Sequence, residues 1–161
     1  MVIVVNMDTE GNRQLWCKDY SIPSKTEAAH AVTDCVLEVL DDYAWGQRDI
    51  FAIHLSLEEA LINAVRHGNR SNSKQNVSIH LEISPDRFLV SVADEGEGFD
   101  PDSLPEPTLD DCLERPCGRG VKLMRSFMTV VSFNESGNRV TLVKERSAPL
   151  ESDSSSGQEQ K

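Results

Sequence analysis

Apolar residues alternate with polar ones in two neighbouring segments of the chain. Residues 77–83 place an apolar side chain at every second position, and residues 88–92 do the same after a short turn. A period of two is typical of strands with one buried face. The two segments therefore predict an antiparallel hairpin. Two further strands are expected at about residues 129–134 and 139–145.

In three other segments, apolar residues recur every three or four positions, as in amphipathic helices. The first helix is expected to start at Ser24, because Ser24 and Glu27 have the spacing of a capping box, and to run to about Trp45. The second covers the apolar positions of residues 50–64 and ends near a glycine. The third covers residues 121–127.

These elements predict an α+β fold. Residues 1–23 add two strands, and the predicted strands pair as hairpins, while each helix has one apolar face. Such elements form a two-layer sandwich, a mostly antiparallel sheet with helices on one face. We expect a single domain at residues 1–146. Residues 147–161 are rich in serine and acidic residues with little to bury, which predicts a disordered tail.

The chain is strongly acidic, with 16 Lys and Arg against 27 Asp and Glu and a formal charge of −11. Such a charge repels phosphate backbones and anionic membranes, and no basic patch is visible in the sequence, so neither is an expected partner. No apolar run approaches the roughly 20 residues of a membrane helix. The opening residues lack signal-peptide features, so we expect a cytoplasmic protein whose four cysteines are free thiols.

Glu59 and Asn63 lie four positions apart within the second predicted helix. Residues four apart point to the same side of a helix, about one turn from each other. A carboxylate and an amide oxygen in this arrangement suit a hard cation together with a water or hydroxyl. Taken alone, the pair is more typical of a solvated helix edge.

A second candidate segment follows the predicted strand at residues 88–92. Asp94 shares the apolar face of that strand because side chains alternate, so its carboxylate is expected at the end of a core-facing row. A buried carboxylate needs a hydrogen-bond donor, and the exocyclic amine of an adenine would serve. Gly96 and Gly98 permit close backbone approach to a flat ring. An ordinary glycine-rich turn is the alternative interpretation.

Gly118, Arg119 and Gly120 stand at the start of the third predicted helix. Free amides at a helix N-terminus bind phosphate, and an arginine there reaches phosphate oxygens. An ordinary glycine-rich helix start is again the alternative. The Walker loop, the dinucleotide glycine motif and the zinc-protease motif do not occur in the chain.

Together, the order and spacing of the three segments are more specific than any one of them. The Glu-Asn pair, the Asp-x-Gly-x-Gly segment and the Gly-x-Gly segment resemble the N, G1 and G2 boxes of the GHKL ATP-binding superfamily. Within it, residues 59–68, 118–128 and 140–144 are similar to the small bacterial anti-sigma-factor serine/threonine kinases of the RsbW and SpoIIAB type. The resemblance covers about residues 20–146.

This resemblance implies a Bergerat-type fold that binds ATP and Mg²⁺ between helices and sheet, under a lid at residues 100–117. Glu59 would orient and deprotonate the attacking hydroxyl, while Asn63 would hold Mg²⁺ and Asp94 would bind the adenine amino group. The other ATP-binding positions that it implies are His67, Gly96, Gly98, Gly118, Arg119, Gly120 and Asn138.

Two features depart from the family pattern. Asn138 stands where the superfamily commonly has a threonine that helps to hold adenine, although asparagine can still form hydrogen bonds. The predicted lid is unusually acidic, and its charges would repel a triphosphate unless they face solvent or pair with Arg115 and Arg119. The acidic residues of the lid are Asp100, Asp102, Glu106, Asp110, Asp111 and Glu114.

The partners implied by the resemblance are a STAS-type anti-anti-sigma protein as substrate and a sigma factor, with homodimers common in the family. Three other functions are compatible with the sequence. The first is an ATP-binding module that sequesters a partner without phosphorylating it. The second is a histidine-kinase-like catalytic domain, although no separate helix pair with a phosphoacceptor histidine is predicted. The third is an interaction domain without a nucleotide.

Overall fold

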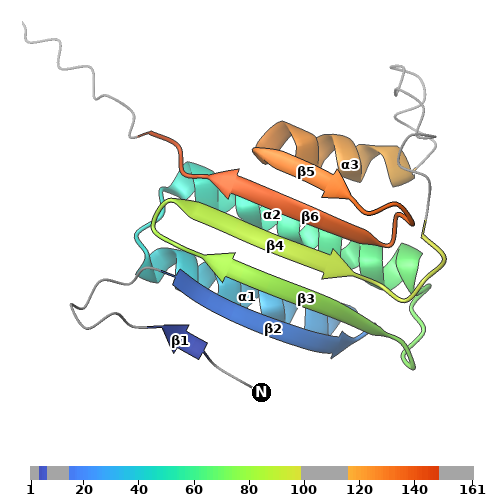
Figure 1. The fold of residues 1–161 in the computed structure, drawn as a ribbon. Coiled ribbons are helices and arrows are strands. Elements are labelled where there is room, and N and C mark those ends of the chain that lie inside the picture. The colour runs from blue at the N-terminus through green and yellow to red at the C-terminus, as the bar shows by residue number, and fades with distance from the viewer. Residues whose placement is uncertain (1–3, 7–14, 99–115, 149–161) are drawn as a thin grey trace, which may run out of the picture.

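The computed structural model describes residues 4–6, 15–98 and 116–148 (Figure 1). In these residues no helix is both long enough and apolar enough to cross a membrane. The elements in chain order are β1 Val4–Asn6, β2 Leu15–Pro23, α1 Thr26–Asp42, α2 Gln47–Asn63, the π-helical turn η1 Ala64–Gly68, β3 Asn76–Ile83, β4 Arg87–Ala93, α3 Pro116–Phe127, β5 Val130–Phe133 and β6 Arg139–Glu145.

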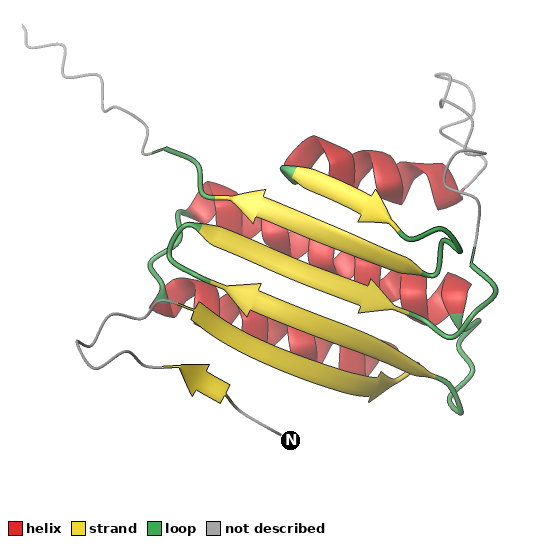
Figure 2. Cartoon of the chain, in the orientation of Figure 1, coloured by secondary structure: helices red, strands yellow, loops and turns green. Residues whose placement is uncertain are grey.

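The strands form one sheet in the order β1-β2-β3-β4-β6-β5, and every neighbouring pair is antiparallel. Figure 2 shows the helices on one side of the sheet, with α1 behind β2 and β3, α2 behind β4 and β6, and α3 beside β5. The predicted two-layer α+β sandwich is therefore confirmed.

The side of the sheet that faces the helices carries the alternating residues that the sequence predicted. Every second residue of β3 and β4 is buried, from Val77 to Ile83 and from Phe88 to Val92. These side chains belong to the same core cluster as Leu57 of α2. Burying one large apolar side chain contributes about 1.5–3 kcal/mol. The core therefore holds β4 firmly against α2, the two elements that carry the candidate residues.

The start of α1 differs from the predicted capping box. Lys25 is the N-cap residue, and no side-chain hydrogen bond caps the helix. The Ser24 hydroxyl instead donates to the Gln75 carbonyl oxygen at 2.9 Å and accepts from the Asn69 side-chain amide at 2.7 Å. The capping-box prediction was wrong because a tertiary contact, invisible to local spacing, takes the Ser24 hydroxyl. The helix also ends earlier than predicted, at Asp42.

Beyond β6 the chain stays attached to the domain for at least two more residues. The backbone N–H and the hydroxyl of Ser147 donate to the Asp49 carboxylate at 2.8 and 2.7 Å. Asp49 is only 2% exposed, and Lys144 Nζ lies 3.6 Å from the same carboxylate. Ser147, the first residue of the predicted tail, therefore packs on the fold, while residues 149–161 lie outside the described residues.

Candidate functional site

A cavity of about 370 Å³ opens between the helices and one end of the sheet. This volume lies within the range typical of small-molecule sites, about 300–1,000 Å³. One wall is apolar and comes from α2, β4, α3, β5 and β6. It consists of Ala60, Val92, Val121, Met124, Phe133 and Val140. Polar groups gather at the other side: Asn63, His67, Arg70, Asp94, Glu97 and Asn138.

One edge of this cavity is formed by α2 and the π-helical turn that follows it. Asn63 is the last residue of α2, and His67 and Gly68 belong to η1; all three line the cavity. The N–H of Asn69 bonds the carbonyl oxygen of Ala64 at 2.9 Å, five residues back. Such π turns are rare and frequently occur at functional sites. Apolar spacing predicted only that the helix ends near Gly68.

Glu59 and Asn63 point the same way, as their spacing predicts. The Asn63 side-chain amide donates to Glu59 Oε1 at 3.1 Å. Glu59 does not itself line the cavity, and its carboxylate packs against Gly120 of α3. A Cβ atom at Gly120 would collide with that carboxylate. The glycine therefore lets α3 approach α2 closely and leaves room for the Glu59 side chain beside Asn63.

Asp94 lies on the same side of the sheet as the buried residues of β4, and both Val92 and Asp94 line the cavity. A Cβ atom at Gly68 would overlap the Asp94 carboxylate, so the carboxylate sits directly on the backbone of the π turn. The N–H of Gly96 donates to Asp94 Oδ1 at 2.9 Å. Gly96 itself packs on the Gly68 carbonyl oxygen and does not line the cavity.

Burial raises the pKa of Asp94, while hydrogen bonds from the backbone N–H groups of Gly96 and of Asp94 itself oppose the shift. The raised pKa means that these donors only partly replace the water that the carboxylate has lost. A donor supplied by a bound molecule would stabilise the ionised carboxylate. The cavity thus offers a hydrogen-bond acceptor that favours a ligand with an N–H group.

The turn between β5 and β6 supplies the last polar edge of the cavity. Gly98 has a φ of 75°, and a Cβ there would collide with the Ser136 carbonyl oxygen. The Asp94 N–H bonds the Asn138 carbonyl oxygen at 3.0 Å. Asn138 lines the cavity, but its side-chain oxygen also accepts hydrogen bonds from Asn134 at 2.8 Å and from Ser136 at 2.9 Å.

Asn69 holds this end of the site together, and sequence reasoning missed it. It is 1% exposed, although it lies in the connection between η1 and β3. Its amide nitrogen donates to Ser24 at 2.7 Å and to the Asn76 carbonyl oxygen at 2.9 Å, and its oxygen accepts from the Glu95 N–H at 2.8 Å. No local pattern distinguishes a buried loop asparagine from an exposed one, so only the fold reveals it.

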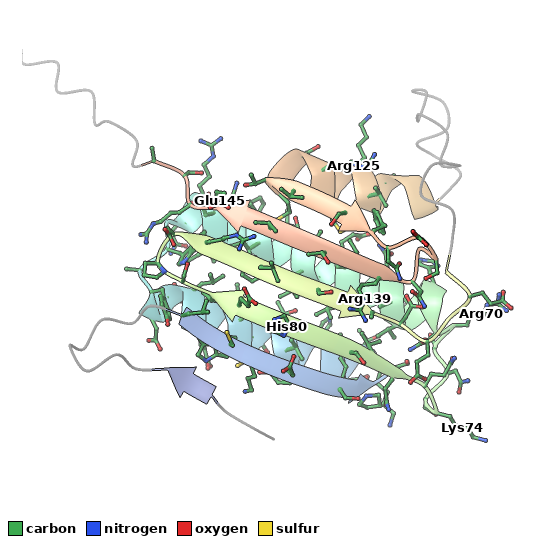
Figure 3. All side chains as sticks on the ribbon, in the orientation of Figure 1. Arg70, Lys74, His80, Arg125, Arg139 and Glu145 are labelled. Carbon is green, nitrogen blue, oxygen red and sulfur yellow. The ribbon has the colours of Figure 1, made fainter. Side chains whose placement is uncertain are left out.

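Some predicted site residues are not brought to the cavity. Helix α3 begins at Pro116, so Gly118 and Arg119 lie in its first turn, at the start of the helix as the sequence predicts. Arg119 is exposed and does not line the cavity. Residues 100–115 of the predicted lid lie outside the described residues. Arg70, which the sequence did not single out, lies at the cavity edge 3.4 Å from Glu97 and projects from this end of the molecule (Figure 3).

A cavity lined by a desolvated aspartate and by a helix asparagine that bonds a neighbouring glutamate is the arrangement expected of an ATP-binding domain of the GHKL class. A family model described as the histidine kinase-like ATPase domain matches residues 22–144. The chain therefore belongs to the histidine kinase-like ATPase domain family, and the predicted superfamily is confirmed.

Curated relatives place the chain near the RsbW-type kinases. It is 30% identical over 135 residues to the serine-protein kinase RsbW of Bacillus velezensis, which covers 78% of this chain and 83% of the relative. It is 35% identical over 111 residues to the serine/threonine-protein kinase BtrW of Bordetella bronchiseptica, which covers 65% of this chain and 76% of the relative. The predicted similarity to this group is confirmed.

A solved structure supports the fold independently. The crystal structure of the RsbU and RsbW domains of a Mycobacterium tuberculosis protein matches with a TM-score of 0.55 at 17% identity. The match covers 81% of this chain and 32% of that chain, so this protein spans about a third of its length. At this identity the likeness establishes the fold alone.

Proposed function

We propose that this chain is an ATP-dependent serine/threonine protein kinase that acts as an anti-sigma-type regulator in a partner-switching system. The observation that carries the proposal is the line of groups along α2 and η1. Glu59 and Asn63 stand at one end of this line, and the Asp94 carboxylate rests on Gly68 at the other. Gly68 lies nine positions after Glu59, which at 1.5 Å per residue is roughly 13 Å along the helix axis. This distance leaves room for a nucleoside and its phosphates between the two ends.

The adenine would lie in the inner part of the cavity. The Asp94 carboxylate would accept a hydrogen bond from the adenine amino group, because burial has left it short of donors. The apolar wall, including Val92, Met124 and Val140, would cover the faces of the ring. Gly96, Gly98 and Asn138 would shape the edge of this seat, and His67 would lie beside the sugar or phosphates.

Asn63 fits a magnesium site in the outer part of the cavity. Its side-chain nitrogen donates to Glu59, so its amide oxygen would be the atom available to a cation, and Mg²⁺ typically takes one or two protein oxygens with waters and substrate phosphates. No group of three His, Cys, Asp or Glu side chains suited to a metal occurs among the described residues, in keeping with this sparse set. When bound, Mg²⁺ neutralises charge on the phosphates.

Helix α3 would face the phosphates with its first turn. Its N-terminal amides and Arg119 can stabilise negative charge there, which supports the proposed roles of Gly118, Arg119 and Gly120. Gly120 also has a second role, because its lack of a side chain leaves room for the Glu59 carboxylate.

In the chemical step, Glu59 is the proposed general base. A serine or threonine hydroxyl of the substrate loses its proton to the Glu59 carboxylate while its oxygen bonds the γ-phosphorus. The bond from that phosphorus to the bridging oxygen breaks, and ADP leaves with the electron pair. The hydrogen bond from Asn63 fixes the orientation of the carboxylate. A well-placed general base contributes about 10²–10⁴-fold to the rate.

The test uses the full chain with γ-labelled ATP, Mg²⁺ and the STAS-domain proteins of the same genome. Label is expected on a serine or threonine of one of them, and Glu59→Gln should lower kcat about 100-fold or more while the ATP Kd stays within about threefold. Glu58→Gln is the matched control, because Glu58 pairs with His54 at 3.7 Å on the side toward α1. Equal rates for the wild type and Glu59→Gln would contradict the proposed base.

The proposed partners are a STAS-type anti-anti-sigma protein as substrate and a sigma factor as the alternative partner, in the cytoplasm where ATP is available. The relatives' names, serine-protein kinase RsbW and serine/threonine-protein kinase BtrW, support the phosphoacceptor class. Sequestration without phosphorylation is the competing function. ATP-dependent capture of a partner with no transfer of label would favour it over the kinase.

A further inference from the structure

The outward side of α2 carries apolar side chains where a solvated helix would be polar. At 100° per residue, positions 51, 55 and 62 lie within about 40° of one another. Phe51 is 56% exposed, and Leu55 and Ile62 are half-buried. On α3, Leu123 and Phe127 are also half-buried, and the rings of Phe51 and Phe127 meet edge to face with centroids 6.0 Å apart. These five residues are here called the apolar strip, and the Phe51–Phe127 contact joins its parts on the two helices.

Cations lie on the solvent side of α3: at 100° per residue, Arg119 is about 40° and Lys122 about 100° from Leu123 around the helix, and Arg125 is about 160° away. Arg119, Lys122 and Arg125 are all exposed, and the helix from Pro116 to Phe127 contains no acidic residue. Because these cations are three residues apart, the sequence shows no basic run, but in the helix they lie together on the solvent side. Arg125 is seen on α3 in Figure 3. On a chain with a net charge of −11, this is a local reversal of sign.

We propose that this apolar strip and the cations on the adjoining solvent side of α3, here called the α2–α3 surface, are where the phosphoacceptor protein docks, through an acidic segment that bears apolar side chains. The inference rests on the proposed kinase function and names the binding surface that serves it. The apolar residues would be covered by the partner's apolar side chains, and the cations would meet its carboxylates. The rest of the acidic chain repels such a partner, so the surface selects both the place and the orientation of docking.

The location of the α2–α3 surface suits a substrate. Ile62 directly precedes Asn63, and Arg119 directly precedes Gly120, which touches Glu59. A segment bound here therefore lies beside the proposed general base. A second copy of the chain suits the surface less well, because a twofold contact would bring the α3 cations of both copies together.

The experiment measures calorimetric binding of the full, Mg-ATP-loaded chain to each STAS-domain protein of the same genome, together with phosphotransfer. Lys122→Glu/Arg125→Glu should weaken binding about tenfold or more, and Phe51→Ala should weaken it by a similar factor, with ATP affinity unchanged. Lys25→Glu/Lys74→Glu is the matched control, because both lysines are exposed and lie off the surface, Lys74 far from α3 (Figure 3). The control should stay within about twofold of the wild type.

Equal binding by the Lys122→Glu/Arg125→Glu variant and the wild type would overturn the inference, even if phosphotransfer is normal and the kinase proposal stands. If binding is weakened in that variant but the wild type transfers phosphate to none of the STAS-domain proteins, the docking surface is supported and the kinase proposal is rejected. Two further measurements can overturn the inference. The first is that the wild type is a dimer in solution and that Phe51→Ala makes it a monomer. The second is that the wild type binds random-sequence duplex DNA and that substituting Lys122 and Arg125 abolishes this binding.

Discussion

At the scale of single residues, Asp94 links protonation to nucleotide binding. Burial raises its pKa because the ionised form has lost water that the backbone donors only partly replace. An adenine amino group would donate a stronger hydrogen bond to the ionised carboxylate than to the protonated acid. Binding of adenine and binding of a proton at Asp94 should therefore oppose each other.

We expect ATP affinity to fall as the pH is lowered through the raised pKa of Asp94, and to be constant above it. Asp94→Asn should remove this dependence and weaken ATP binding by about 10- to 100-fold, because hydrogen bonds to charged groups contribute about 1.5–3 kcal/mol. Titration of a fluorescent ATP analogue between pH 4 and 8 measures both effects. Asp86→Asn, an exposed carboxylate outside the cavity, should keep the wild-type profile.

The same substitution should make the empty protein more stable at neutral pH. A carboxylate whose folded-state pKa lies above its unfolded value destabilises the fold while it is ionised, and this penalty disappears as the pH falls toward the unfolded pKa. Asp94→Asn should therefore raise the free energy of unfolding at pH 7, with a smaller gain at pH 4. Urea unfolding without nucleotide measures it, and a loss of stability at pH 7 would contradict the desolvation of Asp94.

Ser56 of α2 contains a buried polar atom without a partner. Its hydroxyl is fully buried, with no hydrogen-bond partner among the described residues. An unsatisfied buried hydroxyl costs about 1–3 kcal/mol. Ser56→Ala should therefore raise the free energy of unfolding by about 1 kcal/mol, measured by urea denaturation. A decrease would indicate that the hydroxyl is paired in solution.

At the scale of elements, the fit of α3 on α2 depends on Gly120. A Cβ there meets the end of the Glu59 side chain, which can rotate away, so Gly120→Ala should displace the carboxylate without breaking the fold. We expect phosphotransfer to fall about 100-fold, the usual cost of a misplaced catalytic group, with unfolding free energy unchanged or higher. Gly46→Ala is the control, since no atom lies within 4 Å of that added Cβ; its transfer rate should be unchanged.

The elements also show how far local patterns reach. The alternation in β3 and β4 placed Asp94 correctly on the inner face, because a strand alternates whatever surrounds it. The four-residue spacing of Glu59 and Asn63 likewise predicted that they point the same way, and the structure adds the hydrogen bond between them. The capping box at Ser24 failed because distant residues Gln75 and Asn69 take its hydroxyl. The spacing of residues within one element can be predicted from the sequence. Which distant residue bonds a given side chain cannot.

At the scale of the whole molecule, the segment after β6 packs on the fold at the end of α2 away from Asn63. Ser147 satisfies the buried Asp49 carboxylate with two hydrogen bonds, and Lys144 lies beside it. Removing residues 147–161 should lower the free energy of unfolding by about 2 kcal/mol, because it leaves a buried charge with fewer partners. Removing residues 149–161 alone should have little effect. Equal stability of the two truncated chains would exclude a structural role for Ser147.

By itself, the sequence determined the kinds of element, the single helix-covered face of the sheet and the candidate residues Glu59, Asn63 and Asp94. All of these follow from periodicity and from spacing within one element, where the backbone alone relates one side chain to the next.

Only the tertiary structure decided what those residues touch. Three relations join segments far apart in the chain: Gly120 packs against Glu59, the Asp94 carboxylate packs against Gly68, and Asn69 is buried. The cations of α3 became a surface only once the helix formed and packed. Such relations depend on how the apolar faces of separate elements pack into one core, and no local pattern encodes them.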